Sequence, residues 1–245
     1  KNLNRSVHST EPSFGGVMAR NREAKPRSHA CNATLVAYFR QRKGWTQKEL
    51  AAASGYSERL INKAESGRPI STSAIDVLAE ALSTPEGPVA FEDLVSDPLA
   101  LAKAYMAGLY VHQKNIIGAI RHFLDEDIVF RIAGDPNLIP FAGEYRGIAE
   151  MERGFEIFYS IMEVPKDHDY EACFTYIAQG LDVVVVGDSW IHPIGVPLDK
   201  PVHLSHRMKF RKGKLYHFED VYDTLSGAQS LEKARAATNG ELLPI

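Results

Sequence analysis

Residues 44–82 read GWTQKELAAASGYSERLINKAESGRPISTSAIDVLAEAL, and this stretch decides the fold of the amino-terminal part of the chain. Thr46 is placed to cap a helix, and Glu49 three residues later completes a capping box. Gly55 supplies a tight turn, and Ser57 caps the helix that follows. Apolar residues recur at helical spacing between these signals. The pattern predicts a helix-turn-helix bundle, with helices over 34–43, 46–55 and 57–67 and a fourth from Ser71 or Thr72.

The charge of the chain is divided unevenly along its length. The whole sequence has 28 Lys and Arg against 31 Asp and Glu, a net charge of −3. Residues 20–70 hold 11 basic and 4 acidic side chains, a local charge of +7, whereas residues 71–245 carry −11. A nucleic-acid surface requires local positive charge whatever the total. The amino-terminal quarter is therefore the part that suits phosphate, and the remainder repels it.

Length and composition bound the other possibilities. The 245 residues are 44% hydrophobic and 24% charged, typical of a globular protein with one large or two small domains. No run approaches the ~18 apolar residues of a membrane span, and residues 1–16 lack the apolar segment of a signal peptide, so we expect a cytoplasmic location. Met18 is an alternative start, which would make residues 1–17 upstream sequence. Cys31 and Cys173 lie far apart, so no disulfide framework, metal site or cofactor is predicted.

The amino-terminal motif resembles the Cro/lambda-repressor type of helix-turn-helix domain, also called the xenobiotic-response-element family. The matching features are a Trp-Thr-Gln start to the second helix, followed by Ala52, Gly55, Glu65, Gly67 and Pro69. The resemblance implies that double-stranded DNA is the partner and that Gln47 binds a phosphate. It also implies a face in or beside the major groove, formed by Ser57, Glu58, Arg59, Asn62 and Lys63.

The chemistry of these side chains agrees with that role. Arg59 could pair with guanine O6 and N7, Glu58 could accept from cytosine N4, and Lys63 could reach a base or a phosphate. The alternative is that they form only a solvated helix face. Leu60 and Ala64 depart from the family pattern, so the base sequence that the domain reads cannot be transferred from the family.

Breaks in the pattern divide the chain into segments. Pro85, Gly87 and Pro88 interrupt the helical region, and Pro98 after Asp97 is placed to begin a second domain. The predicted segments are a flexible basic arm (1–28), the helix-turn-helix domain (29–86), a linker (87–97), a second domain (98–226) and a tail (227–245). The arm could follow phosphates or enter a minor groove, or be a plain disordered tail. The tail is either a last helix or frayed.

The second domain is predicted to combine helices with a long sheet. Helices are expected over 99–125 and 147–162, and strands over 170–179, 181–192, 201–211 and 214–223. Along VHLSHRMKF, His206 shares a face with apolar residues, whereas His203 lies on the other face, so the two cannot readily chelate a metal. Along LYHFEDVYD, Asp220 falls on the face of Tyr216, Phe218 and Tyr222. A curved antiparallel sheet with helices packed into it satisfies these patterns.

This domain resembles the nuclear transport factor 2-like superfamily, in particular its SnoaL-like and ketosteroid-isomerase relatives. The resemblance spans residues 98–225 and rests on IPFAGEYRGIAEMERGFEIFY and on HRMKFRKGKLYHFEDVYDT. It implies an α+β cone with a curved antiparallel sheet, an apolar pocket and a homodimer. By analogy, the pocket is expected to bind a small apolar or aromatic ligand through Tyr105, Phe130, Phe141, Phe155, Tyr159, Trp190, His206, Asp220 and Tyr222.

Three functions follow from this organisation. The favoured prediction is a sequence-specific transcription regulator, not an enzyme, whose second domain dimerises and senses the ligand. The alternative is a SnoaL-like or ketosteroid-isomerase-like enzyme joined to a DNA-binding domain, with His206 and Asp220 as an acid/base pair. The sequence contains no catalytic set that aligns with either family, so no catalytic residue is assigned. A third possibility is a second domain that only dimerises, around a collapsed cavity.

Overall fold

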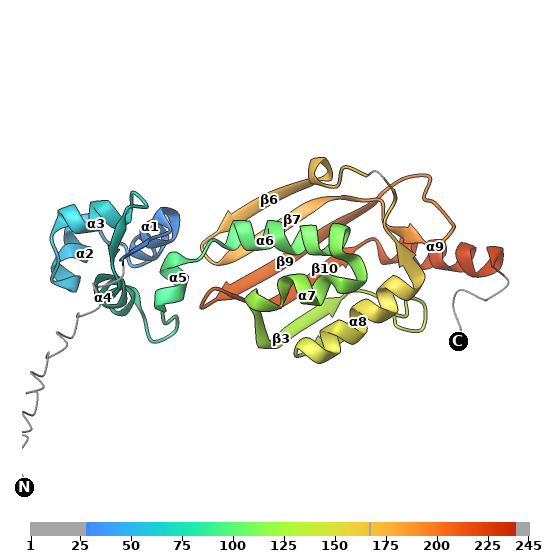
Figure 1. Ribbon diagram of the computed structural model, residues 1–245, viewed down its shortest axis with the longest axis horizontal. Helices are drawn as coiled ribbons and strands as arrows, with labels where there is room; N and C mark the ends of the chain where they lie inside the picture. Colours follow the sequence, from blue (N-terminus) through green and yellow to red (C-terminus); the bar gives the residue numbers. More distant parts are fainter. Residues whose placement is uncertain (1–27, 167, 239–245) are drawn as a thin grey trace, which may run out of the picture.

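The computed structural model describes residues 28–166 and 168–238, and Figure 1 shows a helical bundle at one end of a larger sheet-containing domain. The predicted basic arm, apart from Ser28, lies outside the described residues. The bundle begins with a short antiparallel pair between β1 (Ser28–Ala30) and β2 (Pro69–Ser71). Its helices are α1 (Ala33–Arg42), α2 (Gln47–Ser54), α3 (Glu58–Ala64), α4 (Thr72–Leu82) and α5 (Phe91–Val95).

The helix-turn-helix geometry arises from the caps predicted by sequence. The Thr46 side chain accepts the Glu49 backbone N–H while the Glu49 carboxylate accepts the Thr46 N–H, which is a complete capping box. Gly55 ends α2 with φ of 71°, a left-handed conformation that glycine adopts without strain. The predicted bundle is therefore confirmed. Its core consists of fully buried apolar residues on all four main helices, including Val36, Leu50, Ile61, Ile75, Leu78 and Leu82.

The predicted linker is more ordered than its proline and glycine content suggested. Residues 91–95 form α5, whose Leu94 is fully buried in the bundle core while Phe91 and Val95 pack at its edge. Asn32 holds α5 to α1, because its backbone N–H donates to the Leu94 carbonyl and its side-chain amide to the Ser96 carbonyl. Much of the expected 87–97 linker is thus part of the bundle.

The second domain contains a curved six-stranded sheet with strand order β4-β3-β10-β9-β7-β6. Neighbouring strands are antiparallel except β10 and β3, which are parallel, so the sheet is mixed rather than wholly antiparallel as expected. Strands β4 and β6 lie at opposite edges, and the sheet does not close. The strands are β3 (Leu124–Ile132), β4 (Gly143–Arg146), β6 (Phe174–Gln179), β7 (Asp182–Ser189), β9 (Val202–Arg211) and β10 (Lys214–Tyr222). A separate pair joins β5 (Met162–Glu163) to β8 (His192–Pro193).

Helices cover one face of this sheet, as Figure 1 shows for α6, α7 and α8. They are α6 (Pro98–Ala107), which continues into a π-helical turn (Gly108–His112) and a 3-10 turn (Gln113–Asn115), then α7 (Ile116–Ile120), a 3-10 turn (Arg121–Phe123) and α8 (Ile148–Ile161). A further 3-10 turn (Glu171–Cys173) precedes β6. Helix α9 (Thr224–Ala237) lies at the end of the sheet away from the bundle. The predicted α+β class is confirmed.

Several details differ from the sequence pattern. The helix expected up to residue 125 ends earlier, and the stretch from Leu124 to Ile132 is β3. A bulge between Leu215 and His217 displaces Tyr216 from the inner face, where Leu215 and Phe218 are buried instead.

Two hairpin turns of the sheet contact the bundle, in agreement with Figure 1, where the β6–β7 and β9–β10 turns point toward it. At the β9–β10 turn, the Asp93 carboxylate of α5 accepts the backbone N–H of Lys212 and also that of Ala90, at 2.9 Å for the latter. At the β6–β7 turn, Gly180 has φ of 61° and lies so close to the Tyr38 ring that an added Cβ would overlap it. Leu181 packs against both cores. The bundle and the sheet are therefore joined by a hydrogen bond at one hairpin turn and by side-chain packing at the other.

Candidate functional site

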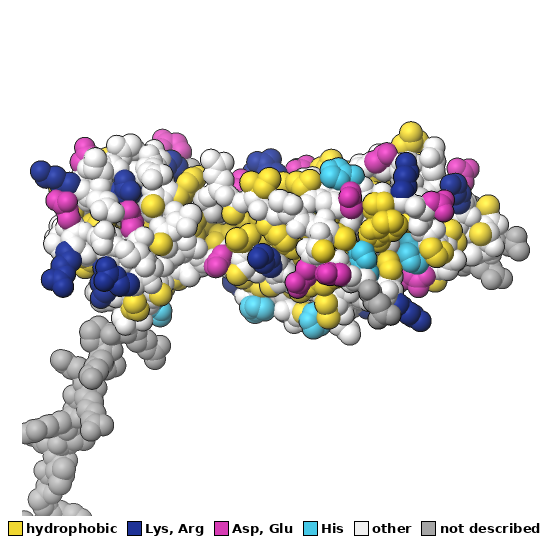
Figure 2. Space-filling model, turned by 90° about the horizontal axis from the view of Figure 1, so that it is seen from above, with side chains coloured by type: hydrophobic (Ala, Val, Ile, Leu, Met, Phe, Trp, Pro, Cys, Tyr) yellow, Lys and Arg dark blue, Asp and Glu magenta, His cyan; other side chains and the backbone are white. Residues whose placement is uncertain are grey.

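The exposed face of α3 carries the residues predicted to read DNA. Ser57, Glu58, Arg59, Asn62 and Lys63 are all exposed, while Ile61 and Ala64 on the opposite face are fully buried. Within the described part of the chain, no carboxylate lies within ion-pair distance of either cation of this face. The N-cap residue makes no side-chain capping hydrogen bond, so its hydroxyl does not serve the helix. Figure 2 shows further Lys and Arg side chains on the outer surface of the bundle.

The helix bearing this face is held by a polar network that sequence patterns did not indicate. The Arg40 guanidinium donates to both carboxylate oxygens of Glu65, at 2.6 and 3.1 Å, and to the Trp45 carbonyl. The two side chains are only 12% and 8% exposed. The hydrogen bond with Glu65 raises the pKa of Arg40 above its usual range. A forked pair of this kind fixes the end of α3 against α1.

Gln47 joins the same network. Its Nε2 atom donates to Glu65 Oε2 at 2.8 Å, and the residue is half-buried at the start of α2. The structure thus places this predicted phosphate contact beside α3 but with its amide already hydrogen-bonded. The predicted arm cations Arg20, Arg22, Lys25 and Arg27 lie outside the described residues.

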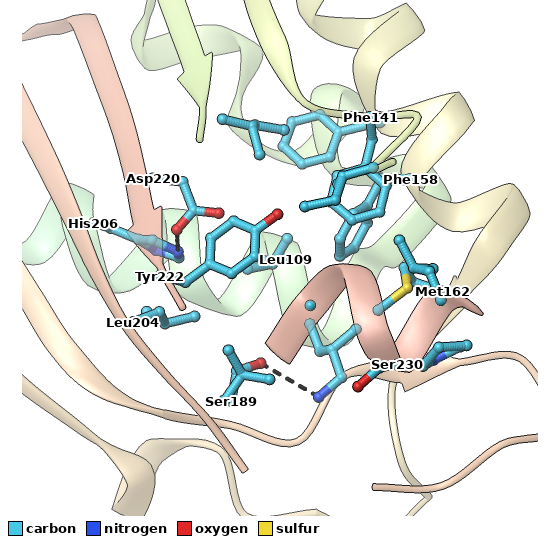
Figure 3. Close-up of a pocket in the computed structure, with 18 of the residues that line it drawn as sticks. Leu109, Phe141, Phe158, Met162, Ser189, Leu204, His206, Asp220, Tyr222 and Ser230 are labelled. Carbon is cyan, nitrogen blue, oxygen red and sulfur yellow. Dashed lines mark hydrogen bonds and ion pairs between the residues drawn. The ribbon is translucent and has the colours of Figure 1, made fainter. Parts of the chain in front are cut away.

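A cavity of about 100 Å³ lies between the inner face of the sheet and the helices of the second domain. Most of its walls are apolar or aromatic. Figure 3 shows Asp220 and Tyr222 extending from the strand side toward Phe141 and Phe158. The lining residues include Tyr105, Leu109, Phe130, Ile132, Ile139, Phe141, Phe155, Phe158, Met162, Ile191, Leu198, Val202, Leu204, Phe218, Gly227, Ser230 and Leu231.

One wall of the cavity has a polar corner formed by His206, Asp220 and Tyr222. His206 Nε2 lies 3.2 Å from Asp220 Oδ1, and the imidazole is 3% exposed. Neither His206 Nδ1, Asp220 Oδ1 nor the Tyr222 hydroxyl has a hydrogen-bond partner of good geometry among the described residues. Buried polar groups normally have partners, because each unpaired one costs free energy. The corner is therefore equipped to bind a polar group brought by another molecule.

Burial keeps the tyrosines of this region neutral. Desolvation, with a further contribution from the Asp220 charge, raises the pKa of both Tyr105 and Tyr222 well above that of a free phenol. The hydroxyl of a neutral Tyr222 can donate a hydrogen bond to a ligand, whereas the Asp220 carboxylate can accept a hydrogen bond from it. The corner thus offers complementary hydrogen-bonding groups.

Most residues predicted to contact the ligand do line the cavity: Tyr105, Phe130, Phe141, Phe155, His206, Asp220 and Tyr222. Tyr159 and Trp190 do not. Tyr159 is buried in the core, and its hydroxyl donates to the Leu109 carbonyl where the π-helical turn leaves that group accessible. Trp190 is half-buried, and its neighbours Ser189 and Ile191 supply the wall instead.

Sequence reasoning missed the end of the cavity farthest from the bundle. Met162, Pro193 and Leu231 complete it, from β5, β8 and α9. Only α9 had a detectable signal, since Leu231 and Ala234 are spaced for one helical face and both are buried. Residues 227–238 of the predicted tail therefore belong to the pocket domain.

A second, wider groove of about 790 Å³ lies outside the cavity, between residues 196–203 and α9. It shares Leu198, Val202 and Ser230 with the inner cavity. Across the described residues, no group of three or more His, Cys, Asp or Glu side chains is arranged to hold a metal ion. None of the described helices combines the length and apolarity that a membrane crossing requires.

Comparison with protein families gives a match to the helix-turn-helix family over residues 36–88. Comparison with curated proteins gives no match. Among solved structures, the chain is similar to an NTF2-like protein from Burkholderia xenovorans, with 22% identity, 55% of this chain and 95% of that chain covered, and a TM-score of 0.45.

Two further solved structures are similar over the same share of the chain. An NTF2-like protein from Burkholderia thailandensis has 22% identity, covers 55% of this chain and 96% of its own, and has a TM-score of 0.43. A protein from Catenulispora acidiphila, described as having a ketosteroid isomerase-like fold in complex with trimethylamine, has 13% identity, coverages of 53% and 92%, and a TM-score of 0.39. The family match and the arrangement of α2 and α3 together place the helix-turn-helix region of this chain within residues 36–88.

Proposed function

We propose that this protein is a DNA-binding transcription regulator whose second domain binds a small apolar or aromatic ligand. The observation that carries the proposal is the presence, in one chain, of a helix-turn-helix domain with an exposed polar α3 face and of an apolar cavity with an unpartnered polar corner. The local charge of +7 over residues 20–70 supports duplex DNA as the partner of the first domain.

In this proposal, α3 enters the major groove. Arg59 pairs with a guanine, Glu58 accepts from a cytosine, and Lys63 reaches a neighbouring base or phosphate. The free cations of this face support the assignment, since neither is neutralised by a carboxylate of the described structure. Gln47 reaches a phosphate with the amide hydrogen that does not bond to Glu65.

The active form is proposed to be a homodimer. Val186, Ser205 and Val221 lie in register across three strands on the outer face of the sheet, and Val221 is half-exposed. Ile177 on β6 adds an exposed apolar side chain to the same face. A two-fold arrangement would present two α3 helices to half-sites about 34 Å apart. Light scattering of the purified chain at micromolar concentration tests this step, and a monomeric mass would contradict it.

The part of the ligand inside the cavity is proposed to be about the size of a single aromatic ring. An engineered protein cavity of ~150 Å³ binds benzene, and the cavity here, at about 100 Å³, is of similar scale. The aromatic walls supply apolar contact, while Asp220 and Tyr222 fix the orientation of a hydroxyl or carbonyl group. The cavity therefore favours a ligand portion that is mostly apolar and carries one polar group.

The ligand signal is proposed to pass through the sheet. Strands β9 and β10 carry His206 and Asp220, and they end at the turn whose Lys212 N–H bonds to Asp93 of α5. A ligand that binds one orientation of the two domains better shifts DNA affinity by the difference in binding free energy. The hydrogen bond between Lys212 and Asp93 at this hairpin is the proposed route of the coupling between the two domains.

Selection of bound duplexes from a random DNA library tests the proposal, with the full chain and Arg59→Ala compared side by side. We expect a defined sequence to be enriched by the wild type and lost with the variant. Lack of enrichment above the starting library would contradict sequence-specific binding.

An enzyme remains the second candidate, favoured by one observation. His206 Nε2 and Asp220 Oδ1 lie 3.2 Å apart in an apolar cavity, which is an arrangement suited to acid/base catalysis. Turnover of candidate ketones and epoxides by the wild type, by His206→Ala and by Asp220→Asn decides the matter. Turnover that is lost in both variants would support the enzyme, and background rates in all three would exclude it for those substrates.

A further inference from the structure

The outer groove continues the inner cavity instead of being a separate surface feature. The two spaces share three lining residues, Leu198, Val202 and Ser230. The inner space is almost wholly apolar apart from its one polar corner, whereas the groove is lined mainly by polar and charged side chains. A molecule that fills the cavity and extends past Ser230 therefore passes from apolar to polar surroundings.

One face of α9 forms the polar wall of this groove. Ser226, Gln229, Ser230 and Lys233 all line it, at the i, i+3, i+4 and i+7 spacing of a single helix face. The adjacent face is buried through Leu231 and Ala234. The helix is thus oriented by its core contacts so that these four polar side chains line the groove, with the Ser226 hydroxyl donating to Asp223 and the Ser230 hydroxyl to the Ser226 carbonyl.

Two lysines and two aspartates supply the formal charges of the groove. Lys200 and Lys233 both line it, and no carboxylate of the described residues lies within ion-pair distance of either. The Asp223 carboxylate keeps its negative charge: one oxygen accepts the Ser226 N–H at 3.1 Å and the other the Ser226 hydroxyl at 2.7 Å, and these hydrogen bonds, with a smaller contribution from the Lys200 charge, lower its pKa. His203 pairs with Asp188 at 2.9 Å. Asp199 supplies the second negative charge of the groove, and because Lys200 acts on Asp223, Lys233 is the lysine available to an anionic ligand.

We propose that the outer groove binds the anionic end of an elongated ligand whose ring occupies the inner cavity, with Lys233 as its main contact. The inference rests on the proposed ligand-binding function and narrows it to a class of molecule. The ligand is an amphipathic acid: an aromatic or alicyclic ring with a hydrogen-bonding group at the Asp220 corner and a flexible chain that ends in a carboxylate. The lysine ammonium on its flexible stem can follow chains of different length.

Matched probe pairs test this assignment in the full-length protein. The probes are para-hydroxyphenyl alkanoates of increasing chain length and the para-alkylphenols of the same length, with binding measured by titration calorimetry. We expect the acid to bind more tightly than its matching alkylphenol once the chain reaches the groove. Because exposed ion pairs contribute about 0.2–1 kcal/mol, the expected gain is about 1.4- to 5-fold. That gain should shrink as salt is raised.

Substitutions identify the residue responsible. Lys233→Gln should remove the advantage of the acid, and Lys233→Glu should make the acid bind more weakly than the alkylphenol, while alkylphenol affinity stays unchanged in both. Lys114→Gln, on an exposed turn beyond the lining of both spaces, is the matched control and should change neither. Equal effects of Lys233→Glu on both probes, or no effect on either, would overturn the inference.

The same experiment separates this inference from the proposed function. If the alkylphenols bind and the acids gain nothing at any chain length, the anionic-end assignment fails while the cavity remains a ligand site. If neither series binds the wild type, the ligand-sensing part of the proposed function fails, and the inference fails with it.

Discussion

Replacing Asp93 should uncouple the two domains. The carboxylate is 3% exposed and connects α5 of the bundle to the β9–β10 turn by accepting the backbone N–H of Lys212, while it also accepts that of Ala90 at the start of α5. Asp93→Ala removes both hydrogen bonds, whereas Asp93→Asn keeps one side-chain oxygen as an acceptor. The two variants therefore differ in how much of the contact survives.

The expected loss follows from the contacts of this carboxylate. A hydrogen bond to a charged group contributes about 1.5–3 kcal/mol, so two are worth about 3–6 kcal/mol before offsets. Burial raises the pKa of Asp93, which means that the folded environment disfavours its charged form. This desolvation cost offsets part of the stabilisation from the two hydrogen bonds. The freed Lys212 N–H lies at an exposed turn where water can reach it. We therefore expect a net loss of about 2 kcal/mol for Asp93→Ala and about 1 kcal/mol for Asp93→Asn.

Urea unfolding of the full chain measures this loss in each domain. The sequence has two tryptophans, Trp45 in the bundle and Trp190 in the second domain, so Trp45→Phe and Trp190→Phe backgrounds report on one domain each. We expect coincident transitions with Asp93 intact, and with Asp93→Ala a bundle transition about 1 M lower in urea than that of the second domain. Coincident transitions at unchanged midpoints in Asp93→Ala would refute the coupling role.

Three other predictions concern the bundle and the cavity. Arg59→Ala should abolish sequence-specific binding in an anisotropy titration, whereas Lys25→Ala should only flatten the salt dependence; equal effects of both on all DNA sequences would count against the groove contacts. Glu65→Ala should destabilise the bundle by about 3 kcal/mol in urea unfolding, at the lower end for a broken buried pair because Arg40 keeps its hydrogen bond to the Trp45 carbonyl, and a loss below about 1 kcal/mol would argue against the network. Tyr222→Phe should leave stability unchanged or slightly raised, since its hydroxyl has no hydrogen-bond partner among the described residues, yet weaken binding of para-alkylphenols by calorimetry; unchanged affinity would remove this hydroxyl from the ligand site.

Local signals made the bundle and much of the sheet predictable. The Thr46 capping box and the glycine turn at Gly55 are short-range features, and the structure has both. Alternation likewise placed His206 among buried residues and His203 on the exposed face. These elements could be predicted from the sequence because the residues that cause each of them lie within a few positions of one another.

Elements whose formation depends on contacts between distant parts of the chain could not be predicted from the sequence. The acidic start of β3, Asp125 to Asp127, disfavours a strand by composition, and the strand forms because Ile128 and Phe130 pack inward while the backbone pairs in parallel with β10. The Glu65 network and the Asp93 contact also join residues far apart in the chain. Neither has a periodicity or a motif that a single sequence would show.

Duplex binding by the full chain at low ionic strength is the most direct test of whether the positively charged amino-terminal domain binds DNA. The measurement is the association constant for the selected DNA sequence as salt is raised. We expect tight binding. The logarithm of the association constant should fall linearly with the logarithm of salt concentration, because Lys and Arg side chains displace counterions from phosphates. Failure to bind any duplex at low ionic strength would contradict it.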